Sequence, residues 1–173
     1  MTTQMSPVPG GVDPRAFRAA LGCFATGVTV ITAQADGRRV GVTANSFNSL
    51  SLDPPLILWS LVKTSSSWPI FEAASHFAVN ILAHDQIDLS NRFARPAEDR
   101  FLGLEVTEGH GGCLLLPGTC ASIQCSRESV VDGGDHWILI GRVTAFARTD
   151  KAPLLYHRGA YSMAQPHPQA AAR

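Results

Sequence analysis

The sequence shows no excess of either charge, because 14 lysines and arginines balance 14 aspartates and glutamates in 173 residues. With only 16% charged residues, it lacks the basic surface that nucleic acids and anionic membranes attract. No apolar run approaches the roughly 20 residues of a membrane-spanning helix, and residues 1–11 lack the pattern of a signal peptide. We therefore expect no nucleic-acid partner, no membrane association and a cytoplasmic location.

Cysteine is sparse and shows no spacing typical of a disulfide framework or a zinc site. The four cysteines, Cys23, Cys113, Cys120 and Cys125, form no CxxC pair, and free thiols are their expected state in a cytosol. His110 and Cys113 enclose two glycines, but no second pair follows at a zinc-type distance. We interpret this segment as a glycine-rich loop and expect no metal site.

The motifs by which many enzymes are recognised are also absent. The sequence contains no GxGxxG dinucleotide fingerprint, no GxxxxGK[ST] phosphate loop, no GxSxG nucleophile elbow and no HExxH zinc pair. The spacing of serine, cysteine and histidine indicates no nucleophilic triad. If the protein is an enzyme, we expect a cofactor to supply the difficult chemistry.

The apolar pattern predicts one helix followed by a succession of strands. Asp13 is a suitable N-cap for this helix, and Pro14 suits its first position. Apolar residues at helical spacing, including Phe17 and Phe24, form one stripe that leads to a helix end at Gly27. Runs of apolar and β-branched residues predict strands over residues 28–33, 40–46, 56–62, 77–82, 119–129 and 136–147. Shorter helices are expected over residues 67–74 and 85–93.

The order of these elements predicts the fold class. Strands follow one another through turns such as Asp36-Gly37 and residues 132–135, without the regular strand–helix alternation of a doubly wound sheet. We therefore predict a mainly β, antiparallel barrel with a few peripheral helices. We assign the domain to residues 13–163 and expect flexible tails at residues 1–12 and 164–173, which have little to bury.

The richest polar segment is Gly41 to Ser51, which places small neutral hydrogen-bonding side chains at a strand end and in the loop after it. Such side chains, together with exposed backbone N–H groups, suit a planar heterocycle whose edge carries donors and acceptors. A connection stabilised by its own side-chain turns is the alternative interpretation.

Other segments offer weaker signals. Lys63 followed by Thr64 and three serines could hold a phosphate just before a helix, or simply begin that helix. Ser90 and Arg92 could reach a phosphate or lie on a solvated helix face. His136 begins a strand after a tight turn, where it could contact a bound ring or serve the structure.

Several motifs together carry a resemblance to a family. They are FATGVTVIT at residues 24–32, TANSFNSLSLDPPL at 43–56, FAVNIL at 77–82, GDHWILIGRV at 134–143 and PLLY at 153–156. With Gln86, Ser90, Phe93 and Tyr161, this order resembles the short-chain flavin reductases, the NAD(P)H:flavin oxidoreductase components of two-component monooxygenases. The resemblance covers residues 14–163. It implies an FMN-binding split barrel of antiparallel, Greek-key-like topology, usually a homodimer, and hydride transfer from NADH or NADPH to FMN or FAD.

The resemblance also implies roles for residues by position. Residues 43–49 would line the flavin ring, residues 60–67 would hold the ribityl chain and phosphate, and Ser90 and Arg92 would lie at the phosphate or adenylate end. His136 would position the nicotinamide, and Gly27 and Tyr161 would border the pocket. The cofactor-binding candidates are Gly27, Thr43, Ala44, Asn45, Ser46, Phe47, Asn48, Ser49, Ser60, Leu61, Lys63, Thr64, Ser65, Ser66, Ser67, Ser90, Arg92 and Tyr161.

Three alternatives remain at this point. The same barrel could keep FMN bound and act on an organic substrate, or bind flavin or haem without turnover. A dimeric interaction domain that binds no flavin is the third. The sequence leaves FMN against FAD, NADH against NADPH, and the partner oxygenase open.

Overall fold

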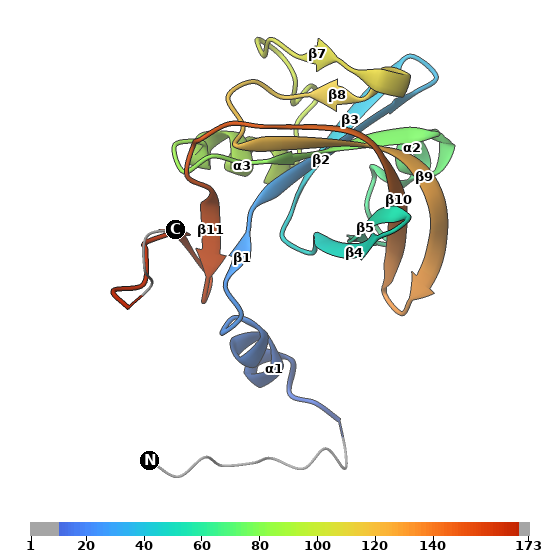
Figure 1. Cartoon of the computed structure of the whole chain (residues 1–173). Helices are drawn as coiled ribbons and strands as arrows, with labels where there is room; N and C mark the ends of the chain where they lie inside the picture. The colour runs from blue at the N-terminus through green and yellow to red at the C-terminus, as the bar shows by residue number, and fades with distance from the viewer. Residues whose placement is uncertain (1–10, 170–173) are drawn as a thin grey trace.

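The protein is mainly β, with short α-helices at its periphery, in a computed structural model that describes residues 11–169 (Figure 1). The helices are α1 (Pro14–Leu21), α2 (Trp68–Ala73), α3 (Ile87–Ala94) and the 3-10 helix η1 (His110–Gly112). The strands are β1 (Thr26–Gly27), β2 (Thr29–Ala35), β3 (Arg38–Ala44), β4 (Asn48–Leu52), β5 (Pro55–Val62), β6 (His76–Ile81), β7 (Thr107–Glu108), β8 (Leu114–Leu115), β9 (Ala121–Gly133), β10 (His136–Arg148), β11 (Leu154–His157) and β12 (Ala160–Met163).

The main sheet has seven strands in the order β3-β2-β6-β9-β10-β5-β4, and all of its neighbouring strands are antiparallel. A smaller sheet, β1-β11-β12, and the pair β7-β8 complete the strands of the described region. The prediction of a mainly β, antiparallel fold is confirmed.

Tight turns set the register of several hairpins. Asp36 and Gly37 connect β2 to β3, and both have positive φ, at 52° and 71°. Positive φ at both central residues is typical of a type I′ turn, whose twist matches the twist of the two strands that it connects. Asp-Gly is a preferred sequence for this turn. Gly134 and Asp135 connect the 13-residue strands β9 and β10 in the predicted place.

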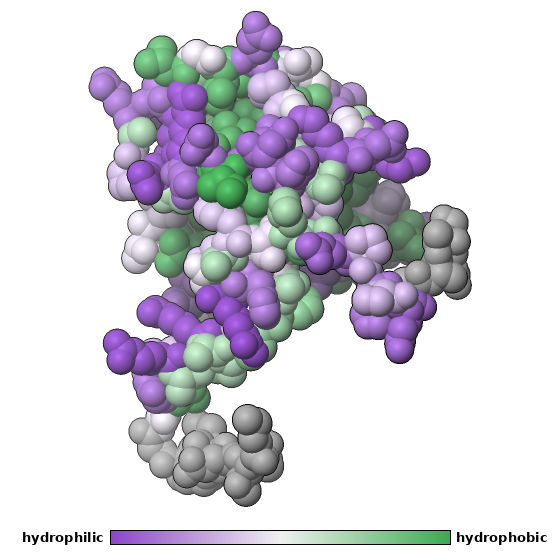
Figure 2. All heavy atoms as spheres, turned by 90° about the vertical axis from the view of Figure 1, so that its left-hand side faces the viewer, coloured by the Kyte–Doolittle hydropathy of each residue, from purple (hydrophilic) through white to green (hydrophobic). Residues whose placement is uncertain are grey.

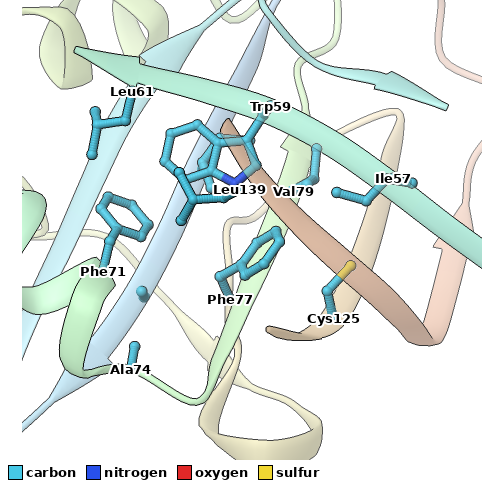
Figure 3. Close-up of a cluster of buried hydrophobic side chains, with 11 residues drawn as sticks. Ile57, Trp59, Leu61, Phe71, Ala74, Phe77, Val79, Cys125 and Leu139 are labelled. Atoms are coloured by element: carbon cyan, nitrogen blue, oxygen red, sulfur yellow. The ribbon is translucent and has the colours of Figure 1, made fainter. Parts of the chain in front are cut away.

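The larger core cluster lies inside the curved sheet (Figure 3). Trp59 is fully buried, with its ring edge-on to Phe71 of α2 at 4.9 Å and tilted against Phe77 at 6.1 Å. Alternate residues of β5 point inward because side chains alternate between the faces of a strand. A second cluster, which includes Phe93, Phe101 and Leu154, packs α3 and the segment after it against β2.

The N-terminal helix differs from its prediction. Asp13 caps α1 as expected, accepting bonds from the backbone N–H groups of Arg15 and Ala16, but the helix ends at Leu21 with Gly22 as its C-cap. Gly27 lies in β1 and not at the helix end, because β1 pairs with β11. None of the residues of α1 is buried, so its apolar stripe packs against no core, and Figure 2 shows α1 projecting below the main body.

Several short strands were not predicted. β4 forms within the segment interpreted as a loop, and β11 and β12 form a hairpin beside β1. The regular elements run from Pro14 to Met163, and residues 1–10 and 170–173 of the predicted tails lie outside the described residues. No helix among residues 11–169 is long and apolar enough to cross a membrane.

Candidate functional site

Three hollows follow one another along strand β3 and the loop after it. The first, about 380 Å³, lies beside residues 38–41, and the second, about 200 Å³, beside residues 43–45. The third, about 950 Å³, shares Asn45 and Tyr156 with the second and opens toward α1. We refer to them as the first hollow, the second hollow and the α1 cleft. Together they suit an elongated ligand better than a compact one.

The second hollow lies between β3, α3 and the β11–β12 hairpin. Thr43 donates its hydroxyl hydrogen to the Ser90 carbonyl at 2.6 Å, which ties β3 to α3. The Ser90 hydroxyl is fully buried and lies 2.9 Å from the Tyr161 hydroxyl, which donates to Asn91 at 3.0 Å. Thr43, Ser90 and Tyr161, named separately from the sequence, therefore meet in one network.

The loop Asn45–Phe47 is held in place by a serine. The Ser46 hydroxyl donates to the carbonyl of Ser60 and accepts from its N–H, both at 3.0 Å. This pair of bonds attaches the loop after β3 to strand β5, although β3 and β5 are separated by four strands in the order of the main sheet. Asn45 is exposed between the second hollow and the α1 cleft and makes no side-chain hydrogen bond within residues 11–169.

Replacing Ser46 by alanine should free this loop. The Ser46→Ala variant loses the hydrogen bonds to the N–H and to the carbonyl of Ser60. Leaving such groups unpaired costs about 1–3 kcal/mol where they are shielded from water. We expect flavin affinity to fall about tenfold, measured by fluorescence titration, while Ser46→Thr retains most of it. Equal affinities of wild type and Ser46→Ala would contradict a role for the loop in binding.

The first hollow combines hydroxyls with arginines. Ser66 and Ser67 line it from the segment before α2, together with Arg38, Arg39 and Arg100 and the acidic residues Glu98 and Asp99. Arg39 pairs with Asp99 at 3.0 Å, and the backbone N–H of Phe101, more than Arg39, lowers the pKa of that carboxyl. Arg100 donates to the carbonyl of Gly41, whereas Arg38 has no carboxylate partner among residues 11–169.

Two charged candidates lie away from these hollows. Lys63 pairs with Asp132 at 2.7 Å, and its ammonium lies 4.5 Å from the centre of the Trp137 ring. Arg92 donates to the carbonyl of Leu102. Both cationic side chains are therefore already bonded to other groups of the protein, and neither lines any of the three hollows.

His136 lies at the start of β10, opposite Val62. Its Nδ1 is 2.7 Å from the carboxylate of Asp135, and the hydrogen bond between them lowers the pKa of Asp135. The half-exposed ring lines none of the three hollows, so one chain by itself does not bring His136 to Asn45.

The remaining candidates divide by exposure. Ala44, Phe47 and Leu61 pack on the larger core cluster, so chiefly their backbone groups are free to contact a ligand. Asn48, Ser49 and Thr64 are exposed outside the hollows, and Ser65 accepts a bond from the N–H of Ser67. Gly27 lies in β1, next to the cleft residue Thr26.

Sequence reasoning missed several residues of the α1 cleft. Arg18 comes from α1, Thr26 from β1 and Arg158 from the turn after β11. The Thr26 hydroxyl is buried and has no hydrogen-bond partner within the described part of the chain. Because Arg18 and Arg158 are 140 positions apart (158 − 18), no local spacing could reveal that they share a cleft.

Known proteins share this sequence and fold. A family model described as a flavin reductase like domain matches residues 21–165. A probable flavin reductase of Rhizobium meliloti is 49% identical over 150 residues, 86% of this chain and 48% of the relative, so the chain spans about half of that protein's length. The FMN reductase (NADH) SmoA of Agrobacterium fabrum is 47% identical over 154 residues, 89% of this chain and 88% of the relative.

The fold comparison agrees with the sequence comparison. The crystal structure of a nitrilotriacetate monooxygenase component B homolog from Mycobacterium thermoresistibile superimposes with a TM-score of 0.86 at 40% identity, covering 92% of this chain and 90% of that one. The resemblance read from the sequence motifs is confirmed. The chain belongs to the family of flavin reductase like domains.

Proposed function

We propose that this chain is a flavin reductase that oxidises NADH or NADPH and delivers reduced FMN or FAD to a separate monooxygenase. The observation that carries the proposal is the row of hollows along β3, in which neutral hydrogen-bonding groups are combined with arginines, in a member of this family. In support, SmoA is named an NADH-dependent FMN reductase, and the M. thermoresistibile structure is named a monooxygenase component.

The residues present fit a flavin ring. The amide of Asn45, which makes no side-chain hydrogen bond within residues 11–169, offers an unused donor and acceptor, which the polar edge of such a ring requires. Tyr156 lines both the second hollow and the α1 cleft and can cover an apolar ring face. Among residues 11–169, no acidic side chain lines either space to repel a ring that gains negative charge.

The chain's own residues position the reactants and exclude water. When bound, flavin supplies the electron-accepting ring and reduced nicotinamide supplies the hydride. The residues of the second hollow and the α1 cleft would hold the two rings against each other, a proximity effect, and would aim donors at developing charge. The loop Asn45–Phe47 is preorganised for this because Ser46 fixes it to β5.

The phosphate end of the flavin belongs in the first hollow. Ser66 and Ser67 supply hydroxyls there and Arg38 supplies a free charge, whereas Lys63 is engaged by Asp132. This assigns the predicted serines to the phosphate and replaces the predicted lysine by an arginine from β3. Hydroxyl and guanidinium groups are suitable phosphate ligands.

The proposal is tested by mixing the purified chain with NADH and riboflavin, FMN or FAD in turn, and following loss of the NADH absorbance. We expect added flavin to be turned over many times, with FMN or FAD preferred to riboflavin. Tight flavin retention without turnover of added flavin, or no oxidation with any flavin, would contradict the proposal.

Replacing His136 by alanine tests its predicted contact with nicotinamide, which requires the second copy of a homodimer because His136 lines none of the three hollows of its own chain. We expect the KM for NADH to rise about threefold to tenfold while flavin affinity stays unchanged, because the half-exposed ring bonds only to Asp135. Steady-state kinetics and flavin titration measure the two quantities. A loss of flavin affinity with an unchanged KM would contradict this role.

We further propose a homodimer in the cytoplasm, where reduced nicotinamide is supplied. Large apolar side chains are exposed on α1 and β4, among them Leu21 at 57% and Leu52 at 93%. Exposed apolar groups that are gathered on one element favour burial against a partner. Light scattering should give twice the mass of 18.5 kDa, and a monomer at micromolar concentration would contradict the dimer.

A further inference from the structure

The α1 cleft carries two arginines on facing elements. Arg18 belongs to the last turn of α1, and Arg158 to the turn between β11 and β12. Figure 1 shows the red β11 strand beside β1, with α1 below both. Within the described part of the chain, the residues that line the cleft include no aspartate or glutamate: Arg18, Ala20, Leu21, Gly22, Phe24, Thr26, Asn45, Ser46, Tyr156, Arg158 and Gly159.

The charge of these arginines is not compensated within residues 11–169. Neither guanidinium forms an ion pair with a carboxylate there. The Arg158 guanidinium has one side-chain contact, to the Cys23 sulfur at 3.9 Å, and the Arg158 backbone N–H donates to the carbonyl of Gly22 at 2.9 Å. The hairpin turn is thus fixed to the end of α1 while both charges stay available.

The backbone at Arg158 favours a different residue. Its φ is 50° and that of Gly159 is 82°, so the pair forms a hairpin turn with two positive φ angles. Asn-Gly is the preferred sequence for such a turn, and a long side chain in this conformation is uncommon. Residues in sparsely populated conformations cluster at binding sites, so an arginine at this position favours a binding role for its side chain.

We propose that Arg18 and Arg158 form an anion subsite that binds the pyrophosphate of the nicotinamide dinucleotide. This inference rests on the proposed function. Guanidinium groups bind phosphate oxygens in a bidentate manner, and a pair of them matches a doubly charged pyrophosphate. We have assigned the flavin phosphate to the first hollow. The α1 cleft is therefore left for the pyrophosphate of NADH or NADPH, the other substrate that carries phosphate groups.

The rest of the cleft suits the rings attached to such a pyrophosphate. Leu21, Phe24 and Tyr156 offer apolar surface, and the buried Thr26 hydroxyl offers an unused polar atom. Asn45 connects the cleft to the second hollow, where the flavin ring is proposed. A nicotinamide that enters from the cleft would therefore reach the flavin without passing through the protein core.

Arg18→Gln and Arg158→Asn test the subsite, with Arg15→Gln as the matched control on the same helix. Asparagine tolerates the positive φ at position 158 better than arginine does. The melting temperature of the Arg158→Asn variant should therefore equal or exceed that of the wild type. We expect each cleft variant to raise the KM for NADH at least tenfold with kcat changed less than twofold. Arg15→Gln should leave both unchanged.

Binding of inorganic pyrophosphate gives a readout that does not depend on turnover. Calorimetric titration should detect it in the wild type and in Arg15→Gln, and at least tenfold more weakly in Arg18→Gln and Arg158→Asn. Titrations with riboflavin and FMN identify the source of the phosphate. A selective loss of FMN affinity in the cleft variants would overturn the assignment to nicotinamide.

Two failures can be told apart. Pyrophosphate binding that depends on the two arginines, in a chain that reduces no flavin, would overturn the proposed function while the anion subsite stands. Normal flavin reduction with an unchanged KM for NADH and unchanged pyrophosphate binding in both variants would overturn the subsite alone.

Discussion

Replacing Asn45 by tryptophan should abolish flavin binding and leave the fold intact. Asn45 lines both the second hollow and the α1 cleft, so an indole there would fill the space proposed for the flavin ring. We expect affinity for FMN to fall more than about 100-fold, or about 2.7 kcal/mol. Because the side chain is exposed and belongs to a loop, the core is not disturbed.

Fluorescence titration measures the affinity, and circular dichroism checks that the variant is folded. Asp150→Trp, in an exposed loop outside the hollows, introduces the same bulk and should bind FMN normally. A folded Asn45→Trp variant that binds FMN like the wild type would place the ring elsewhere.

Replacing Asn80 by leucine should strongly destabilise the protein. Asn80 is fully buried in β6, and its amide donates to the carbonyl of Val30 and the hydroxyl of Thr32, both at 3.1 Å, and weakly to the carbonyl of Leu114. Its oxygen accepts from the N–H of Leu116 at 2.9 Å. Leucine removes all of these bonds and leaves the N–H of Leu116 buried without its acceptor, at about 1–3 kcal/mol for that group alone. The carbonyl of Leu114 still accepts from the Thr32 hydroxyl at 2.6 Å.

We expect a loss of about 3 kcal/mol or more, which corresponds to a melting temperature lower by about 6–12 °C for a chain of this size. Thermal unfolding measures it, and Asn48→Leu on the exposed strand β4 is the control, expected to change stability by less than about 0.5 kcal/mol. Equal melting temperatures of Asn80→Leu and the control would show that the network contributes nothing.

Asn80 also shows what a local pattern cannot reveal. The FAVNIL run identifies a strand correctly because its β-branched and apolar residues fit a pleated, buried surface. Its partners, Leu114 and Leu116, lie on a distant segment. In the sequence the asparagine interrupts an apolar run. In the structure its side chain bonds the segment around Leu114 and Leu116 to β6.

Helix α1 gives the opposite case. Its cap at Asp13 and its apolar stripe follow from local chemistry, which the structure reproduces. The expected end at Gly27 is wrong because pairing of β1 with β11, a long-range contact, claims residues 26–27 as a strand. Backbone hydrogen bonds to a distant strand replaced the helical ones that local spacing predicts.

The sequence alone determined the mainly β class, the turns at Asp36-Gly37 and Gly134-Asp135, and the family, because periodicity, turn chemistry and ordered motifs are local properties of the chain. Long-range packing was needed to show that Ser46 bonds to Ser60, that Lys63 pairs with Asp132, and that Arg18 lines the same cleft as Arg158. Such contacts depend on which strands become neighbours, and that is settled by burial of the shared core rather than by any short segment.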